Sequence, residues 1–207
     1  MHLQRDQISV DGKRVQSEAK VYLMMNKPRG LVTTASDEKG RRTVYSLLKE
    51  GTANVVGTGW RSSSQWLAPV GRLDKASEGL LLLTNDFEWG ARITAPEAHL
   101  DKTYHVQIGA SANGELLEAL VRGVKADAGD TLGAKRARLL RSGPKNSWLE
   151  IILDEGKNRH IRRMLGALGI EVLRLVRVAI GPLQLGELPK GAVRRLSREE
   201  EQLLDNA

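Results

Sequence analysis

Asp74 is the acidic residue of this sequence that is best placed to do chemistry. It ends a basic turn containing Gly71 and Arg72, and a run of four leucines follows at residues 80–83, after Gly79. A short apolar run between turn-forming residues predicts a strand that is buried on both faces. A carboxylate just upstream of such a strand is held on a rigid element and shielded from bulk water, the setting that perturbs acids.

Two further segments carry residues that could act together with Asp74. Residues 102–108 alternate in polarity, which predicts a half-buried strand with Tyr104 on one face. Apolar residues at helical spacing predict a helix from near Asn158 to Gly169. The dipole of such a helix favours acids near its N-terminus, whereas an anion-binding site there would favour the cations that the sequence has. The residues in its first turns are Arg159, His160, Arg162 and Arg163.

Each of these features also has an ordinary structural explanation. A lone Asp in a loop more often caps or turns the chain. A buried strand tyrosine is usually a core residue, and a cationic helix face is usually solvated. The four histidines lack the spacing of metal ligands, so no metal site is expected.

The composition sets limits on the class of protein. A chain of 207 residues can build a substantial core, and the absence of cysteine excludes disulfides and thiolate metal sites. No window approaches 18 apolar residues and no signal peptide is recognisable, so we expect a cytoplasmic protein without a membrane span. The net charge of +7 favours a polyanionic partner.

The elements that must position the candidate residues are strands with helices between and after them. This pattern predicts an α+β fold with a mixed, mostly antiparallel sheet and flanking helices. Residues 124–133 and 183–196 are expected to be loops. Strands are expected at 21–26, 80–83, 102–108, 134–141, 148–154 and 172–180, and helices after Asp86, after Asn113, near Asn158 and after Ser197.

Common nucleotide-binding and hydrolase signatures are absent from the sequence. There is no phosphate-binding P-loop and no nucleophile elbow of the serine hydrolases. Gly57 and Gly59 lack a third glycine and the strand-to-helix context of a dinucleotide fingerprint. We therefore expect no nucleotide cofactor.

Three segments, in this order and at this spacing, resemble the motifs of the bacterial ribosomal RNA pseudouridine synthases of the RsuA/RluB/RluE/RluF group. Residues 71–86 resemble the catalytic motif, residues 102–106 the tyrosine motif and residues 155–164 the arginine motif. The resemblance covers nearly the whole chain. It implies that residues 21–207 form a pseudouridine synthase catalytic domain with a central cleft.

The first 20 residues depart from the group's usual pattern. The group usually begins with an S4-type RNA-binding module, and here only residues 8–15 resemble its final hairpin, with an Asp11-Gly12 turn. Residues 1–20 are therefore expected to be a linker or a remnant of an S4-like domain.

The resemblance also implies roles for individual residues. Asp74 would be the nucleophile, Tyr104 would pack against the target uracil and offer a phenol for proton transfer, and Arg162 would pair with Asp74. A guanidinium beside a carboxylate favours its charged form in a dry cleft. The residues expected to bind the RNA are Arg72, Lys102, Lys157, Arg159 and Arg163.

The function that this implies is isomerisation of a uridine in ribosomal RNA, with the large-subunit 23S RNA favoured over 16S. The reaction needs no metal or cofactor, and we expect a monomer that acts on ribosomal RNA or an assembly intermediate. Two alternatives remain open. One is a non-catalytic RNA-binding or ribosome-assembly protein, and the other is a hydrolase that uses Asp74 with Glu78.

Overall fold

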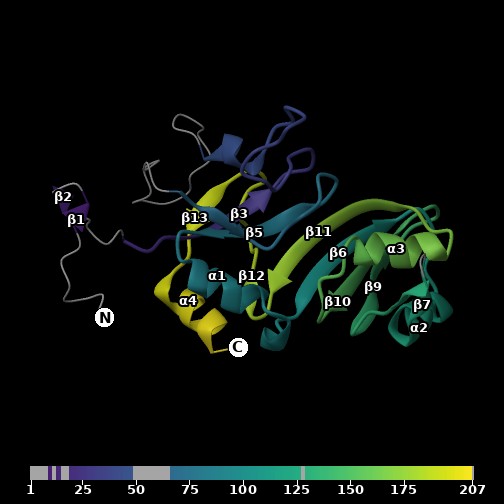
Figure 1. Ribbon diagram of the computed structural model, residues 1–207. Helices are drawn as coiled ribbons and strands as arrows, with labels where there is room; N and C mark the ends of the chain where they lie inside the picture. Colours follow the sequence, from purple (N-terminus) through teal and green to yellow (C-terminus); the bar gives the residue numbers. More distant parts are fainter. Residues whose placement is uncertain (1–8, 11–12, 15–18, 49–65, 127–128, 207) are drawn as a thin grey trace.

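A nine-stranded sheet runs through the protein (Figure 1). The computed structural model describes residues 9–10, 13–14, 19–48, 66–126 and 129–206. Its main path has the strand order β13-β3-β5-β11-β6-β10-β9, and β4 and β12 pair with β5 and β11. The strands are β3 (Tyr22–Lys27), β4 (Ala68–Val70), β5 (Glu78–Thr84), β6 (Lys102–Ile108), β9 (Arg136–Ser142), β10 (Ser147–Leu153), β11 (Val172–Ile180), β12 (Leu183–Gln184) and β13 (Val193–Arg195).

The sheet is mixed but mostly antiparallel, which confirms the predicted α+β class. The β5–β11 pair is parallel, and the other pairs of this sheet are antiparallel. The flanking helices are α1 (Phe87–Thr94), α2 (Gly114–Arg122), α3 (His160–Ala167) and α4 (Arg198–Asp205), with short 3₁₀ helices η1 (Val44–Leu47) and η2 (Pro96–Ala98).

Three helices begin where the sequence predicts because a side chain caps them. Asp86 accepts a hydrogen bond from the Trp89 amide at the start of α1. Asn113 does the same at α2, and Ser197 forms a capping box with Glu200 at α4. Such side chains satisfy amide groups that have no partner within the helix.

The parallel contact between β5 and β11 joins two halves of the sheet. It consists of the register pairs Val176 with Glu78 and Arg177 with Gly79. Gly79 has a φ of +104°, and a Cβ atom there would overlap the carbonyl oxygen of Arg177. Glycine is therefore required at this seam for the two strands to approach.

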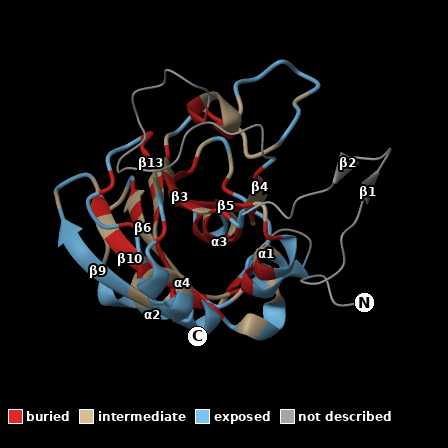
Figure 2. Ribbon diagram, turned by 90° about the vertical axis from the view of Figure 1, so that its left-hand side faces the viewer, coloured by how far each residue is buried: buried red, intermediate tan, exposed pale blue. Residues whose placement is uncertain are grey.

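The two halves are covered differently. In the half containing β3 and β5, apolar clusters pack on both faces, and β5 is buried along its whole length, as predicted. In the half containing β6, β9 and β10, the apolar cluster includes residues of α2 and α3. The edge strand β9 is largely exposed (Figure 2).

Several short strands were not predicted. Residues 124–133, expected as a loop, contain the paired strands β7 (Val124–Lys125) and β8 (Thr131–Leu132). Residues 183–196 contain β12 and β13, which add to the main sheet. Strands of two or three residues are too short to show an alternating pattern.

At the N-terminal end, β1 (Ser9–Val10) pairs antiparallel with β2 (Lys13–Arg14), which agrees with the predicted hairpin. Its Asp11-Gly12 turn lies outside the described residues, as do Gly57 and Gly59. In the described part of the chain, no helix is both long and apolar enough to span a membrane.

Candidate active site

A cleft of about 900 Å³ lies at the junction of the two sheet halves. The loop between β4 and β5, strands β6 and β11, and the segment before α3 contribute to its walls. Asp74, Tyr104 and Arg159 all line it, so the three segments singled out in the sequence meet there. Of the predicted RNA-binding residues, the cleft is lined by Arg72, Lys102, Lys157 and Arg159.

The Asp74 carboxylate is open to this cleft. Its side chain is 31% exposed, and the nearby cation is Arg159, whose Nη1 lies 3.7 Å from Oδ2. Arg159 occupies the N-cap position of α3 with a left-handed backbone (φ +49°). A half-exposed ion pair at this distance holds a carboxylate only loosely.

The predicted pairing of Arg162 with Asp74 is not what the structure has. Arg162 donates from Nη2 to the carbonyl oxygen of Ala76 (3.0 Å) and from Nη1 to that of Val172 (3.2 Å). Burial lowers the pKa of Arg162, and Arg159 adds to this, while Asp74 acts in the opposite direction. Arg162 therefore supports the turn that carries Asp74 by holding its backbone.

Lys27 supports the same turn from inside the protein. The side chain is fully buried, and its ammonium donates to the carbonyl oxygens of Asp74 (3.0 Å), Ser77 (2.9 Å) and Pro28 (3.2 Å). Burial lowers the pKa of Lys27 from 10.5 to about 8, although the nearby Asp74 and Glu78 favour its charged form. A buried ammonium in this position fixes the backbone on both sides of the turn.

Arg177, buried in β11, completes this support. Its Nε donates to the carbonyl oxygen of Leu80 (2.8 Å) and its Nη1 to that of Arg72 (3.5 Å). We call the groups that hold the carbonyl oxygens around Asp74 the carbonyl cradle. They are Lys27, Arg162, Arg177, the Thr33 hydroxyl on Leu73 and the Gly30 amide on Lys75.

Sequence reasoning missed Lys27 and Arg177 as parts of the site. Nothing in the sequence marks Lys27 as buried, because lysine is a surface residue by type. Arg177 gave a usable signal, because a charged residue interrupts the apolar residues of the strand 172–180.

Two other predicted RNA-binding cations lie beside acidic side chains. Arg163 lies 2.7 Å from Asp130 and does not line the cleft. Lys157 lines the cleft and lies 3.0 Å from Glu155. Arg163 is therefore the predicted RNA-binding residue that the structure does not bring to the cleft.

Lys102 and Tyr104 lie next to each other along the cleft wall on β6. Both are half-buried. Burial lowers the pKa of Lys102, and Arg177 acts in the same direction. Tyr104 also packs against apolar residues of both sheet halves, so its ring is positioned by the core.

Glu78 is not placed to work with Asp74. It is 3% exposed, and Arg174 binds both of its carboxylate oxygens at 3.0 Å while Lys190 lies 2.5 Å from Oε2. Burial pushes the pKa of Glu78 up, but these cations outweigh burial and the pKa is lowered. Glu78 does not line the cleft, so the hydrolase alternative loses its second carboxylate. Among the described residues, no group of three or more His, Asp or Glu is placed to hold a metal ion.

Comparison with known proteins decides the family. The sequence profile of RNA pseudouridylate synthases matches residues 21–167. The chain belongs to this family. The match includes Asp74, Tyr104, the whole carbonyl cradle except Arg177, and the start of α3. As a pseudouridine synthase, the protein is an isomerase that acts on RNA.

Relatives of known sequence cover most of this pseudouridine synthase. It is 39% identical over 197 residues to the ribosomal large subunit pseudouridine synthase B of Bacillus subtilis (strain 168), covering 94% of this chain and 75% of that protein. It is 36% identical over 196 residues to an uncharacterised RNA pseudouridine synthase of Aquifex aeolicus (strain VF5), covering 94% and 74%.

Solved structures agree with the fold of a pseudouridine synthase. A crystal structure described as a pseudouridylate synthase superimposes with a TM-score of 0.73 at 29% identity, covering 99% of this chain and 82% of that chain. An archaeal box H/ACA Nop10-Cbf5 complex gives a TM-score of 0.51 at 15% identity, covering 81% and 50%. The second likeness shows a shared fold alone.

Proposed function

We propose that this pseudouridine synthase modifies a uridine of the large-subunit 23S ribosomal RNA, as a member of the RsuA/RluB group, with Asp74 as its nucleophile. The observation that carries the assignment of Asp74 is its carboxylate, which faces the cleft while its backbone is held by buried cations. The ribosomal substrate is supported by the name of the Bacillus subtilis relative and by the net charge of +7.

The reaction rearranges bonds within one nucleotide. The bond between ribose C1′ and uracil N1 breaks, the uracil rotates, and a bond forms between C1′ and C5. The C5 proton passes to solvent and N1 gains a proton, so nothing is oxidised or reduced. Asp74 could attach covalently to the sugar or to the base, or assist removal of a ribose proton.

Tyr104 is proposed to stack against the target uracil and to take part in proton transfer, a contribution typically worth about 10²–10⁴ in rate. Extruding the uridine from its stack costs a few kcal/mol, which contacts with the flanking phosphates offset. The side chains proposed to make these contacts are Arg72, Lys102, Lys157 and Arg159 at the cleft and Arg163 beside it. Arg162 is proposed to act through the Asp74 turn, which it contacts at Ala76.

The same proposal extends to the organisation of the protein. Residues 21–207 would form the catalytic unit, and residues 1–20 a linker or a remnant of an S4-like module. The protein would act as a monomer in the cytoplasm, on ribosomal RNA or an assembly intermediate.

Release of tritium tests this function directly. The protein is incubated with 23S and 16S transcripts and with ribosomal particles, all carrying uridine tritiated at C5. We expect stoichiometric tritium release from a 23S-containing substrate, and mapping of pseudouridine in the product identifies the site. Release from 16S RNA alone would overturn the large-subunit assignment, and release from none of these RNAs would overturn a ribosomal substrate.

A further inference from the structure

Among the described residues, α2 and α3 are the helices that pack against the sheet half containing β6, β9, β10 and β11, and they cover one of its two faces. Val106, Leu149 and Leu175 belong to the apolar cluster that packs with α2 and α3. Because side chains alternate along a strand, their neighbours project to the opposite side. We call this side the rear face; it carries Thr103, His105 and Gln107 of β6, Arg136, Arg138 and Arg141 of β9, Trp148, Glu150 and Ile152 of β10, and Arg174 of β11.

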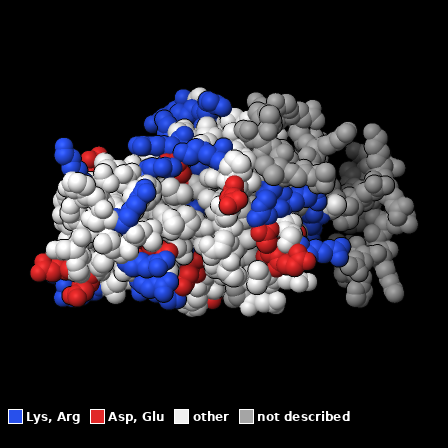
Figure 3. Space-filling view, turned by 180° about the vertical axis from the view of Figure 1, so that it is seen from behind, with Lys and Arg blue, Asp and Glu red and all other residues white. Residues whose placement is uncertain are grey.

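The rear face carries more arginines than acidic residues. The side chains of Arg136, Arg138 and Arg174 are 65%, 60% and 42% exposed. In Figure 3, which views the molecule from behind, Lys and Arg side chains recur across the surface. Arginines on an open surface form the electrostatic footprint expected for a polyanion.

Trp148 holds two of these arginines in place. The guanidinium carbon of Arg141 lies 5.2 Å from the centroid of its ring, and that of Arg174 lies 5.8 Å from it. Stacking on an aromatic ring restrains a guanidinium without using up its hydrogen-bond donors. Arg141 is therefore pre-organised to contact an anion, which lowers the entropic cost of binding. Arg174 already donates to both carboxylate oxygens of Glu78 and serves to hold the ring of Trp148 in place.

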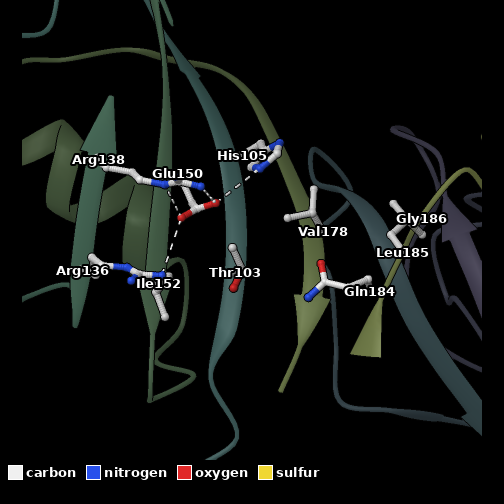
Figure 4. A pocket seen from close by; sticks show the side chains of 10 residues that line it. All are labelled: Thr103, His105, Arg136, Arg138, Glu150, Ile152, Val178, Gln184, Leu185 and Gly186. Atoms are coloured by element: carbon white, nitrogen blue, oxygen red, sulfur yellow. Dashed lines mark hydrogen bonds and ion pairs between the residues drawn. The ribbon is translucent and has the colours of Figure 1, made fainter. Parts of the chain in front are cut away.

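A hollow of about 530 Å³ deepens this face (Figure 4). Glu150 lies at its edge, where Arg138 donates to both carboxylate oxygens at 2.7 and 2.9 Å. Arg136 and His105 lie 3.9 and 3.8 Å from the same carboxylate. Glu150 orients these side chains but neutralises one charge only, and Arg174 is bound bidentately to Glu78. Arg136 and Arg141 therefore remain available to an anion.

We propose that the rear face binds the sugar-phosphate backbone of a second segment of the RNA whose target uridine enters the cleft. This inference rests on the proposed RNA substrate, and it adds a binding surface separate from the catalytic cleft. None of the four arginines of this face lines the cleft. Contacts on two sides of the protein would raise its affinity for a large folded RNA without altering the chemistry.

The double variant Arg136→Gln plus Arg141→Gln tests the rear face. Both side chains are exposed, and Arg138 is left in place because it binds Glu150. Affinity for a 23S transcript is measured by filter binding over a range of salt concentrations. We expect binding to weaken about tenfold, and the slope of log K against log salt to become shallower by about 1.5, since two phosphate contacts are lost.

The matched control is Arg122→Gln plus Lys125→Gln, which removes two exposed cations from α2 and β7. A loss of affinity confined to the Arg136/Arg141 variant supports the rear face. Equal losses in both variants, or an unchanged slope in the first, would overturn it.

A short hairpin carrying the target uridine separates this inference from the proposed function. Such an RNA is too small to reach both sides of the protein, so tritium release from it should be the same in wild type and in the Arg136/Arg141 variant. If the wild type releases no tritium from any RNA, the proposed function fails, while the salt dependence of transcript binding still decides the rear face.

Discussion

Two carboxylates in this protein, Asp74 in the cleft and Glu150 on the rear face, are held in opposite ways. Glu150 is fixed through its oxygens, since Arg138 donates to both, and it is only 8% exposed. Asp74 is fixed through its backbone, while its carboxylate has one loose contact with Arg159 at 3.7 Å. A carboxylate whose lone pairs are occupied orients its neighbours, whereas one held by its backbone keeps its lone pairs for a substrate.

The positive charges around the two carboxylates are also placed differently. Hydrogen bonding from Arg138 is the main cause of the lowered pKa of Glu150. Around Asp74 the cations of the carbonyl cradle contact carbonyl oxygens, so they contribute positive potential without covering the carboxylate. Positive charge that is fixed before the reaction needs no reorganisation during it.

The largest effect is expected from Asp74→Asn. If Asp74 is the nucleophile, tritium release should fall by about 10³-fold or more. The free energy of unfolding should change by less than about 1 kcal/mol, because the variant loses only a loose, half-exposed ion pair. Release from C5-tritiated RNA and urea denaturation measure the two quantities. If the variant keeps its activity, Asp74 has a structural role only, as Glu150 does.

Lys27→Met tests whether the cradle positions Asp74. The variant removes the donor to three carbonyl oxygens, so the turn should shift and kcat should fall about 100-fold. KM for the RNA should stay nearly constant, since Lys27 does not line the cleft. Lys75→Met, which removes an exposed cation from the same turn, is the control and should change kcat little. A raised KM with unchanged kcat would assign Lys27 to substrate binding.

Glu150→Gln should lower stability and leave turnover unchanged, the reverse of what is expected for Asp74→Asn. Losing a charge-assisted bidentate contact should lower the free energy of unfolding by about 1.5 kcal/mol. Turnover of a short hairpin RNA should remain that of the wild type. Chemical denaturation and single-turnover assays give both values, and a large loss of turnover would contradict the separation of the two regions.

The smallest expected effect is a response to alkaline pH through Lys27. As the pH rises through about 8, the folded protein loses the Lys27 proton, while the unfolded chain keeps it until about 10.5. The unfolded state then binds more protons, so the contribution of this group to stability increases between these values. Activity should decrease about fivefold over the same range, since a neutral amine has two N–H donors for three acceptors. In Lys27→Met this decrease should be absent; if it persists, another group causes it.

Local signals in the sequence predicted much of the fold. The leucine run predicted a strand buried on both faces, and Asp86, Asn113 and Ser197 marked three helix starts. These features depend on neighbouring residues, so a single sequence contains them. Strand β13 depends on β3, a partner far along the chain, and its sequence alone does not reveal it. Strand β12 pairs with the adjoining end of β11, but its two residues are too few to show an alternating pattern.

The site was only partly predictable for a similar reason. Asp74 and Tyr104 were placed in one cleft as expected, but Arg159 lies nearer to the Asp74 carboxylate than the paired residue that was predicted, Arg162. The left-handed backbone of Arg159 sets this arrangement, and helical periodicity gives no sign of it, because positive φ is uncommon outside glycine. Lys27 is a surface residue by type, and only the packing of the whole sheet buries it.

Gly79 has a consequence for how variants of this protein should be interpreted. It has no side chain to touch RNA, yet any other residue there would collide with the Arg177 backbone and adopt a strained φ. Such a substitution would force apart the strands that carry Glu78 and Arg177 and change the width of the cleft between the two halves. A harmful mutation at position 79 would therefore act by changing the distance between the two strands. A second mutation that restores a charge or a catalytic group elsewhere would not rescue it.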